Sequence, residues 1–332
     1  MGATMKVLLC HEPGPDLARE LAGYASEGLD ISCVGDDDSE GLAAALATAE
    51  VVWHVLKPLT AAHIHAAPAL RLIQKIGVGV NTIDLDTARS RHIPVCNMPG
   101  TNTQAVAEMT LLLMLGALRR FSMLDANLRK AGAWAPAPEV QEGFGEIRGR
   151  AIGLIGYGAI PSVLTPILQA MGASVCYWSR QPKASAAAQW KPLKDLLAGS
   201  DIVSLHLPLT PETEGLIDVD ALAGMKHGAI LVNTARGGLV DEAALISALN
   251  SGRLAAAGLD VFATEPLPAQ SPLTTLPNVV LSPHVAWLTR ETWRRSVSVA
   301  VENCRRLAAG SELLYRVTTS RNPDDPARKL FP

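Results

Sequence analysis

The sequence has few cysteines and no clustered metal ligands. Its five cysteines, Cys10, Cys33, Cys96, Cys176 and Cys304, are scattered through 332 residues, without a C-x-x-C pair or a Cys/His group at zinc-ligand spacing. An odd number of cysteines in a chain of this length fits a reducing compartment better than a disulfide framework. We therefore expect a cytoplasmic protein with no structural metal ion.

Two further absences exclude other classes. The longest apolar stretch, Met109 to Leu118, is too short to cross about 30 Å of hydrocarbon, and the start of the chain lacks the apolar core of a signal peptide. Cationic residues are not in excess either, because 29 Lys and Arg stand against 32 Asp and Glu. Since nucleic-acid affinity needs clustered positive charge, we expect neither a nucleic-acid partner nor a membrane span.

Apolar residues are plentiful and occur in short β-rich runs that alternate with Ala/Leu-rich helical stretches. They make up 48% of the chain, enough for one large or two medium domains. Strands are expected at 6–10, 31–34, 51–55, 72–76 and 93–96, with helices near 15–25, 41–49, 61–66 and 84–91. A long helix is expected from about 103 to 120, followed by a less regular stretch.

A second alternating series begins at about residue 151. Strands are expected at 151–155, 174–178, 201–205, 228–232, 255–260 and 278–281, with helices at about 159–171 and 289–309. Near-continuous apolar strands separated by helices indicate parallel sheets that are covered on both faces. The predicted fold is α/β, with two Rossmann-like or flavodoxin-like doubly wound domains and an active-site cleft between them.

A glycine turn joins the strand 151–155 to the helix that follows. It reads Gly156-Tyr-Gly-Ala-Ile160. In such a turn the first glycine allows a sharp bend, and the second lets the backbone approach a pyrophosphate at the helix N-terminus. Contacts with a dinucleotide are therefore predicted at Gly156, Tyr157, Gly158, Ala159 and Ile160.

Two prolines depart from the usual fingerprint. Pro161 replaces the third glycine, in the first helical turn, where proline is tolerated. Pro166 lies deeper and is expected to kink the helix, because it removes one i to i−4 hydrogen bond.

The second strand of this series ends without the carboxylate that normally accepts the ribose hydroxyls of NAD. It is followed instead by Ser179, Arg180 and Lys183. A hydroxyl donor and two cations suit a 2′-phosphate, which a carboxylate would repel. We predict that NADP is preferred over NAD; the alternative is that Arg180 and Lys183 are ordinary solvated loop charges.

Three residues that can bind and protonate a substrate follow later strands. Arg236 follows the strand 228–232, Glu265 follows 255–260, and His284 follows 278–281. Ligands of open α/β sheets bind beyond the carboxyl ends of the strands, so the three side chains are expected to converge. Each alone has an ordinary structural interpretation, as a turn cap, a surface acid and a loop histidine.

The chemistry of this set fits the reduction of a 2-oxo acid. Arg236 presents a planar fork to the carboxylate and the ketone. His284 as imidazolium donates a proton to the carbonyl oxygen, and Glu265 orients the ring and is expected to raise the histidine pKa.

The chain resembles the D-isomer-specific 2-hydroxyacid dehydrogenase family, which includes glyoxylate/hydroxypyruvate reductases, phosphoglycerate dehydrogenases and formate dehydrogenase. The resemblance covers most of the chain, in the segments Gly77–Asp84, Asn97–Glu108, Ile152–Ile160, Leu205–Thr210, Met225–Asp241, Gly258–Pro266 and Ser282–His284. It implies that Arg236, Glu265 and His284 are the catalytic set. At Ser179 and Arg180 the sequence resembles the NADPH-using glyoxylate and hydroxypyruvate reductases of the family.

The resemblance also implies how the chain divides into domains. Residues 1–100 plus 290–332 would form a discontinuous substrate domain and residues 101–289 the dinucleotide-binding domain, with a homodimer through the region 102–140. Backbone N–H groups of Val78, Gly79 and Val80 would meet the substrate carboxylate. Cofactor contacts would come from Leu207, Pro208, Thr234, Ala235 and Asp260, of which Asp260 would bind the carboxamide.

Two tryptophans have open interpretations. Trp287 either covers the substrate pocket or packs at a domain interface, and Trp134 is expected to be a dimer-contact or core residue.

The predicted function is therefore NADPH-dependent reduction of small 2-oxo acids, with glyoxylate and hydroxypyruvate the most plausible. Alternatives are a corepressor-like protein that senses NAD(P), a phosphoglycerate dehydrogenase-type activity, and a methyltransferase that shares the glycine turn. The methyltransferase would have no use for the Arg/Glu/His set.

Overall fold

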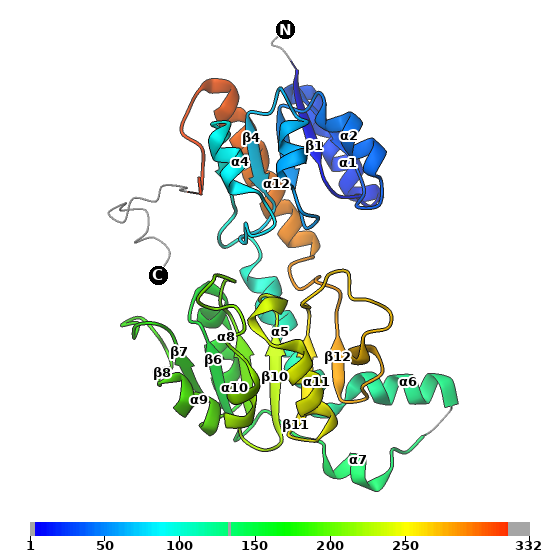
Figure 1. The fold of residues 1–332 in the computed structure, drawn as a ribbon, viewed down its shortest axis with the longest axis vertical. Helices are drawn as coiled ribbons and strands as arrows, with labels where there is room; N and C mark the ends of the chain where they lie inside the picture. The colour runs from blue at the N-terminus through cyan, green and yellow to red at the C-terminus, as the bar shows by residue number, and fades with distance from the viewer. Residues whose placement is uncertain (1–3, 132–133, 318–332) are drawn as a thin grey trace. The chain divides into compact units, whose positions relative to one another are not determined.

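The chain divides into two compact units. The computed structural model describes residues 4–131 and 134–317. One unit comprises the chain up to Thr101 together with the segment from Thr289 onward, and the other comprises Asn102–Leu288. Each unit is built around its own parallel sheet, as expected for the predicted α/β class (Figure 1).

The first unit has a five-stranded parallel sheet with the order β2-β1-β3-β4-β5. Its strands are β1 (Met5–Leu9), β2 (Leu29–Cys33), β3 (Val51–His54), β4 (Leu72–Lys75) and β5 (Val95–Cys96). The helices are α1 (Pro15–Gly23), α2 (Ser39–Leu46), α3 (Ala61–His65), α4 (Leu85–Ser90) and α12 (Arg290–Ala309). This strand order is that of the flavodoxin-like doubly wound fold.

The segment after α12 belongs to the edge of this sheet. Asn97 N donates to Tyr315 O (3.1 Å) and Val317 N donates to Val95 O (2.7 Å), so the chain runs beside β5. Covering an edge strand satisfies backbone groups that would otherwise be open to pairing with another chain.

The second unit has a seven-stranded parallel sheet with the order β12-β11-β10-β9-β6-β7-β8. Its strands are β6 (Ala151–Ile155), β7 (Ser174–Trp178), β8 (Gln189–Trp190), β9 (Ile202–Leu205), β10 (Ala229–Asn233), β11 (Leu254–Leu259) and β12 (Val279–Leu281). The chain reverses direction across the sheet between β6 and β9, which is the point where dinucleotides bind in Rossmann folds.

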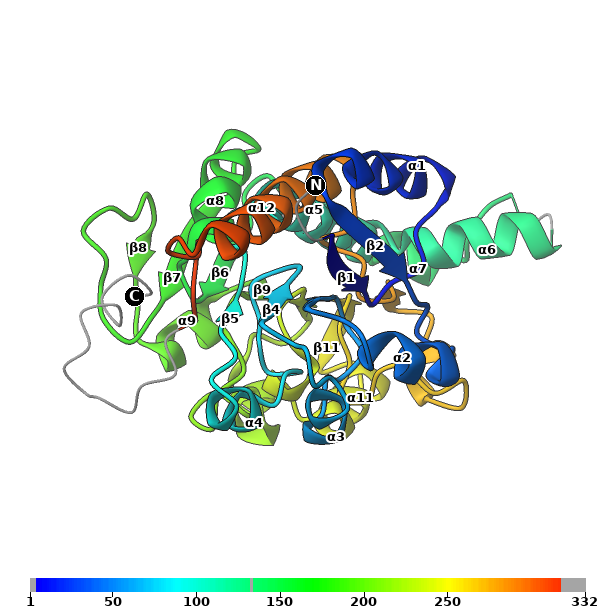
Figure 2. The same ribbon diagram turned by 90° about the horizontal axis from the view of Figure 1, so that it is seen from above.

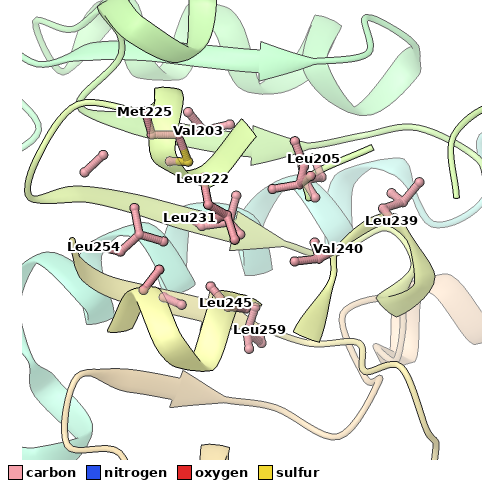
Figure 3. Close-up of a cluster of buried hydrophobic side chains, with 14 of the residues drawn as sticks. Val203, Leu205, Leu222, Met225, Leu231, Leu239, Val240, Leu245, Leu254 and Leu259 are labelled. Atoms are coloured by element: carbon pink, nitrogen blue, oxygen red, sulfur yellow. The ribbon is translucent and has the colours of Figure 1, made fainter. Parts of the chain in front are cut away.

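Helices cover both faces of this sheet. They are α5 (Thr103–Arg119), α6 (Phe121–Ala131), α7 (Pro138–Glu142), α8 (Ala159–Ala170), α9 (Leu193–Gly199), α10 (Val219–Gly224) and α11 (Glu242–Asn250). Alternate residues of one strand enter opposite cores. Leu231 lies in a cluster with residues of α9, α10 and α11, of which Leu222 and Leu245 are seen in Figure 3. Ile230 and Val232 lie in a second cluster with residues of α5 and α8. Burial on both faces explains why these strands are continuously apolar in sequence.

One sequence expectation was wrong in this unit, and another stays a prediction. The stretch after residue 120 contains the helices α6 and α7, and α6 extends beyond the β12 edge of the sheet (Figures 1 and 2). Arg120 separates α5 from α6 with a left-handed backbone (φ 48°), which ends the first helix without a glycine. The helix α8 continues through Pro166, whose side chain lies on its exposed face, and a kink at this residue stays a prediction.

Candidate active site

The three predicted catalytic residues lie in loops at the carboxyl ends of three neighbouring strands. Arg236 follows β10, Glu265 follows β11 and His284 follows β12, and these strands are adjacent in the sheet. The electrostatic influence of Arg236 reaches Glu265, and Glu265 contacts His284 directly. The structure therefore brings the three side chains together in one unit of the chain.

Glu265 holds the imidazole of His284 at one nitrogen. His284 Nδ1 lies 2.6 Å from Glu265 Oε2, and the other oxygen, Oε1, accepts a hydrogen bond from Phe262 N (3.0 Å). A carboxylate that accepts at Nδ1 requires a proton there, so Nε2 is the atom left for exchange with a ligand. Both side chains retain some exposure, 19% for His284 and 33% for Glu265.

The surroundings favour the charged form of Glu265. Partial burial alone would raise its pKa, but the hydrogen bond and charge of His284, the N–H of Phe262 and the charge of Arg236 together hold it below its ordinary value. Burial lowers the pKa of Arg236, and the negative charge of Glu265 opposes that shift. The group thus combines a guanidinium with a carboxylate and an imidazole.

The lowered pKa of Glu265 makes the stability of the fold depend on pH. Because the Glu265 pKa is lowered by folding, its carboxylate stabilises the fold above the ordinary value of 4.5, and the contribution is lost as the pH falls below it. We expect Glu265→Gln to lower the melting temperature at pH 7, with a difference from wild type that shrinks below pH 4.5. Thermal denaturation across this range checks the sign, with Glu139→Gln on the exposed helix α7 as the matched control. A difference that grows at low pH would contradict it.

The loop that carries Arg236 is fixed by its own strand end. Asn233, the last residue of β10, donates from Nδ2 to Arg236 O (2.9 Å) and accepts from Ala235 N at Oδ1 (3.0 Å). The next residue, Gly237, lies so close to the backbone of Phe262 that a Cβ there would overlap the Phe262 carbonyl. The arginine loop and the loop leading to Glu265 are therefore in direct backbone contact.

Asp260 anchors the segment that contains His284, a role that the sequence did not predict. It is fully buried, and its carboxylate accepts hydrogen bonds from Ser282 Oγ, Val285 N (3.0 Å) and Ala286 N (2.9 Å). Burial raises the pKa of Asp260, and these bonds and the charge of His284 oppose the shift. Its contact with a carboxamide stays a prediction.

The backbone of His284 is itself unusual. It has φ 55°, in the left-handed region that non-glycine residues seldom occupy, and its N–H donates to Asp260 O at 2.7 Å. Such conformations persist where the surroundings fix them, and they cluster at functional sites. The Asp260 anchor supplies that constraint here.

The glycine turn fits a dinucleotide phosphate. Gly156 has φ 95°, and a Cβ there would lie 2.5 Å from His206 O and 3.0 Å from the side chain of Leu207. At Gly158, the N-cap of α8, a Cβ would meet nothing within 4 Å, so the backbone at the start of this twelve-residue helix is open. An open helix N-terminus next to a sharp glycine bend is suited to an anion. The predicted pyrophosphate contacts lie in this turn and at the start of α8, and they stay predictions: Gly156, Tyr157, Gly158, Ala159 and Ile160.

The residues predicted at the ribose end lie in one loop after β7, but one of them differs from expectation. The hydroxyl proton of Ser179 is donated to Gln181 O (2.6 Å), so it does not point to a ligand as a donor. The reason is local, since the chain turns back after Arg180 and brings the Gln181 carbonyl to the hydroxyl. Arg180 is exposed and Lys183 is half-buried.

The other predicted contacts lie at strand ends in both units. Leu207 and Pro208 follow β9, and Thr234 Oγ1 lies 2.9 Å from Thr110 Oγ1 on α5. In the first unit Val78, Gly79 and Val80 follow β4, and the Val78 carbonyl accepts from Asn97 Nδ2 (3.0 Å). The side chain of Trp287 is buried, whereas Trp134 is 89% exposed and so is not a core residue.

The described part of the chain has neither a helix that could span a membrane nor a group of side chains placed to hold a metal ion. Over residues 4–131 and 134–317, no helix has the length and hydropathy needed to span a bilayer. In the same residues no group of three or more His, Cys, Asp or Glu side chains is placed to hold a metal ion.

Comparison with known proteins identifies the family. The model for the NAD-binding domain of D-isomer-specific 2-hydroxyacid dehydrogenases matches residues 111–286. The chain belongs to this family. It is 44% identical over 252 residues to a glyoxylate reductase from Aeropyrum pernix, with 74% of this chain and 75% of that protein covered.

Two further 2-hydroxyacid dehydrogenase relatives extend the comparison. A D-3-phosphoglycerate dehydrogenase from Mycobacterium bovis is 38% identical over 301 residues, which cover 89% of this chain and 56% of that protein, so the chain spans little more than half of this relative. The NADPH-dependent glyoxylate/hydroxypyruvate reductase from Sinorhizobium meliloti, solved with NADP and malonate, has a TM-score of 0.80 at 28% identity, with 95% of this chain and 97% of that one covered.

Proposed function

We propose that this protein reduces small 2-oxo acids, such as glyoxylate or hydroxypyruvate, to D-2-hydroxy acids with NADPH as the hydride donor. The observation that carries the proposal is the convergence of Arg236, Glu265 and His284 at the ends of adjacent strands, with His284 Nδ1 held 2.6 Å from Glu265 Oε2. A half-buried cation beside an oriented acid–base pair is suited to the reduction of a carbonyl next to a carboxylate.

The roles of the side chains follow from this geometry. The nicotinamide cofactor, when bound, supplies the hydride to the carbonyl carbon. Arg236 binds the substrate carboxylate and the carbonyl oxygen, and its charge stabilises the negative charge that develops on that oxygen. His284 donates the proton to the same oxygen from Nε2, and in the reverse direction it accepts it. Glu265 orients the ring through its contact with Nδ1.

The loop after β4 in the first unit is a separate candidate site for an anion. The carbonyl groups of Gly77 and Val78 accept from Met98 N (2.8 Å) and Asn97 Nδ2 (3.0 Å). We propose that the backbone N–H groups of Val78, Gly79 and Val80 bind an anion, because successive backbone N–H groups form such sites.

The preference for NADPH rests on the loop after β7. Arg180 and Lys183 are the cations of this loop, and between Trp178 and Ala188 the sequence has no carboxylate that would repel a phosphate. The proton of Ser179 is committed to Gln181 O, so we assign the recognition of the 2′-phosphate to the two cations.

We also propose a homodimer through the region 102–140. Apolar side chains lie exposed on α5, α6 and the segment that follows: Leu112 is 60%, Phe121 64%, Leu128 50% and Trp134 89% exposed. Several large apolar side chains exposed within one segment of the chain favour a protein interface there. The partner that fits is a second copy of the same surface.

A phosphoglycerate dehydrogenase-type activity is the second candidate, favoured by the 38% identity to the Mycobacterium bovis protein. Steady-state kinetics separate the two. We expect turnover of glyoxylate and hydroxypyruvate with NADPH and little oxidation of D-3-phosphoglycerate. No turnover of any 2-oxo acid, with cofactor binding intact, would contradict the proposed function.

The cofactor preference is tested separately at Arg180. We expect Arg180→Ala to lower kcat/KM for NADPH about tenfold, because a charge-assisted contact is lost, and to leave kcat/KM for NADH unchanged. The control is Lys194→Ala, which removes an exposed cation of α9 in the same unit. Equal use of both cofactors by the wild type would contradict the preference.

A further inference from the structure

Two buried tyrosines hold the loop that carries Arg180 and Lys183. This cofactor loop, residues 180–188, connects β7 to β8 and is mostly exposed. The side chains of Tyr157 and Tyr177 lie beneath it, and they are only 5% and 1% exposed. Phenylalanine rings would pack equally well at these two buried positions, so packing alone does not explain the two hydroxyl groups.

The Tyr177 hydroxyl is bonded to the backbone of Lys183. Its oxygen accepts from Lys183 N at 2.6 Å and lies 3.4 Å from Lys183 O. The Tyr177 hydroxyl thus takes the place of a backbone carbonyl as the acceptor for the N–H of Lys183. The ammonium group of this lysine is the one proposed to bind the phosphate. A phenylalanine would fill the same volume and leave the Lys183 N–H without this acceptor.

The Tyr157 hydroxyl binds the other end of the loop. It accepts from Ala187 N (3.1 Å) and donates to Thr165 Oγ1 on α8 (3.2 Å), while Gln169 Nε2 of the same helix donates to Ala187 O (2.9 Å). Tyr157 is also the residue between Gly156 and Gly158 of the phosphate turn. One side chain therefore connects the pyrophosphate turn to the loop at the ribose end.

The two rings are in contact with each other. Their centroids are 4.4 Å apart at an interplanar angle of 42°, a separation typical of aromatic pairs. The end of β7 is held in addition by Trp190 Nε1, which donates to Ser179 O (2.9 Å). The chain is thus held at Ser179, just before the loop, and at Lys183 and Ala187 within it, and tyrosine hydroxyls bind the backbone N–H groups of the last two.

We propose that Tyr157 and Tyr177 are positioning residues that fix the cofactor loop and thereby set the affinity for a phosphorylated dinucleotide over its unphosphorylated form. The inference rests on the proposed NADPH preference and assigns its structural basis. The cations alone do not make a site, because an unanchored loop would have to be ordered at the expense of binding free energy.

The experiment uses Tyr177→Phe in the full chain. Calorimetry should show the Kd for NADP⁺ rising about fivefold, the loss expected for one neutral hydrogen bond, while the Kd for NAD⁺ stays within twofold of wild type. Trypsin should cleave after Arg180 or Lys183 faster in the variant, because the loop opens more often. Tyr157→Phe should act in the same direction through Ala187.

Two controls separate anchoring from general loss of stability. Tyr24→Phe removes a hydroxyl in the first unit and should change neither cleavage nor the two Kd values. In a Lys183→Ala background, which keeps the backbone N–H, Tyr177→Phe should have little further effect on the Kd for NADP⁺, because the anchored ammonium group is gone.

The outcomes distinguish this inference from the proposed function. A wild type that binds NADP⁺ and NAD⁺ equally would overturn the NADPH preference. The role of the tyrosines would still be decided by the rate of trypsin cleavage and by the ratio of the two Kd values in Tyr177→Phe. That role is overturned if Tyr177→Phe is cleaved at the wild-type rate, or if it is cleaved faster while the ratio of its two Kd values stays within twofold of wild type.

Discussion

His284→Ala is expected to lower kcat for a 2-oxo acid by about 10² to 10⁴ fold, the contribution typical of a positioned general acid. The Kd for NADP⁺ should stay near the wild-type value, because the residues that would hold the phosphates belong to the glycine turn and the cofactor loop. Stopped-flow or steady-state rates of NADPH consumption together with calorimetry measure the two quantities.

A matched histidine is available as the control. His227 is exposed in the turn before β10, in the same unit but at the opposite end of that strand, so His227→Ala should retain the wild-type kcat. If His284→Ala kept more than a tenth of the wild-type kcat, the proton would have to come from another group.

Arg236→Ala is expected to change both kinetic constants: kcat should fall about 10² to 10³ fold, and KM for glyoxylate should rise. The guanidinium is proposed to bind the ground-state carboxylate and also the oxygen that becomes negative, so its loss affects binding and the barrier together. The charge of Glu265 would in addition lose one of the cations that lower its pKa.

Arg236→Lys is the control for geometry. Lysine keeps the positive charge but not the planar fork, so it should recover part of kcat while KM stays raised. A variant Arg236→Ala that changes KM alone would mean that the arginine contributes only to uniform binding and not to stabilisation of the developing charge.

The parallel strands and the convergence of Arg236, Glu265 and His284 could be predicted from the sequence because each leaves a local signal. A strand buried on both faces is a short continuous apolar run, and β10, with Leu231 in one core and Ile230 and Val232 in the other, is an example. Arg236 and His284 were found because a charged or titratable residue directly after such a run lies at the edge where ligands bind.

The features that escaped prediction depend on contacts between distant residues. Tyr157 and Tyr177 lie twenty positions apart, and only the pairing of β6 with β7 brings their rings together. The role of Asp260 depends on N–H groups more than twenty residues later in the chain. The helix α6 was missed because the left-handed residue between it and α5 is an arginine, which carries no signal of a helix end.

The close approach at Gly237 limits how this site can diversify. Since the Phe262 carbonyl lies where a methyl group would extend, hydrogen is the one substituent that the position accepts without moving the backbone. Altered substrate ranges would then have to arise from side chains that border the reacting groups, and remodelling either loop alone would disturb its neighbour. A redesign of the site should therefore exchange both loops together.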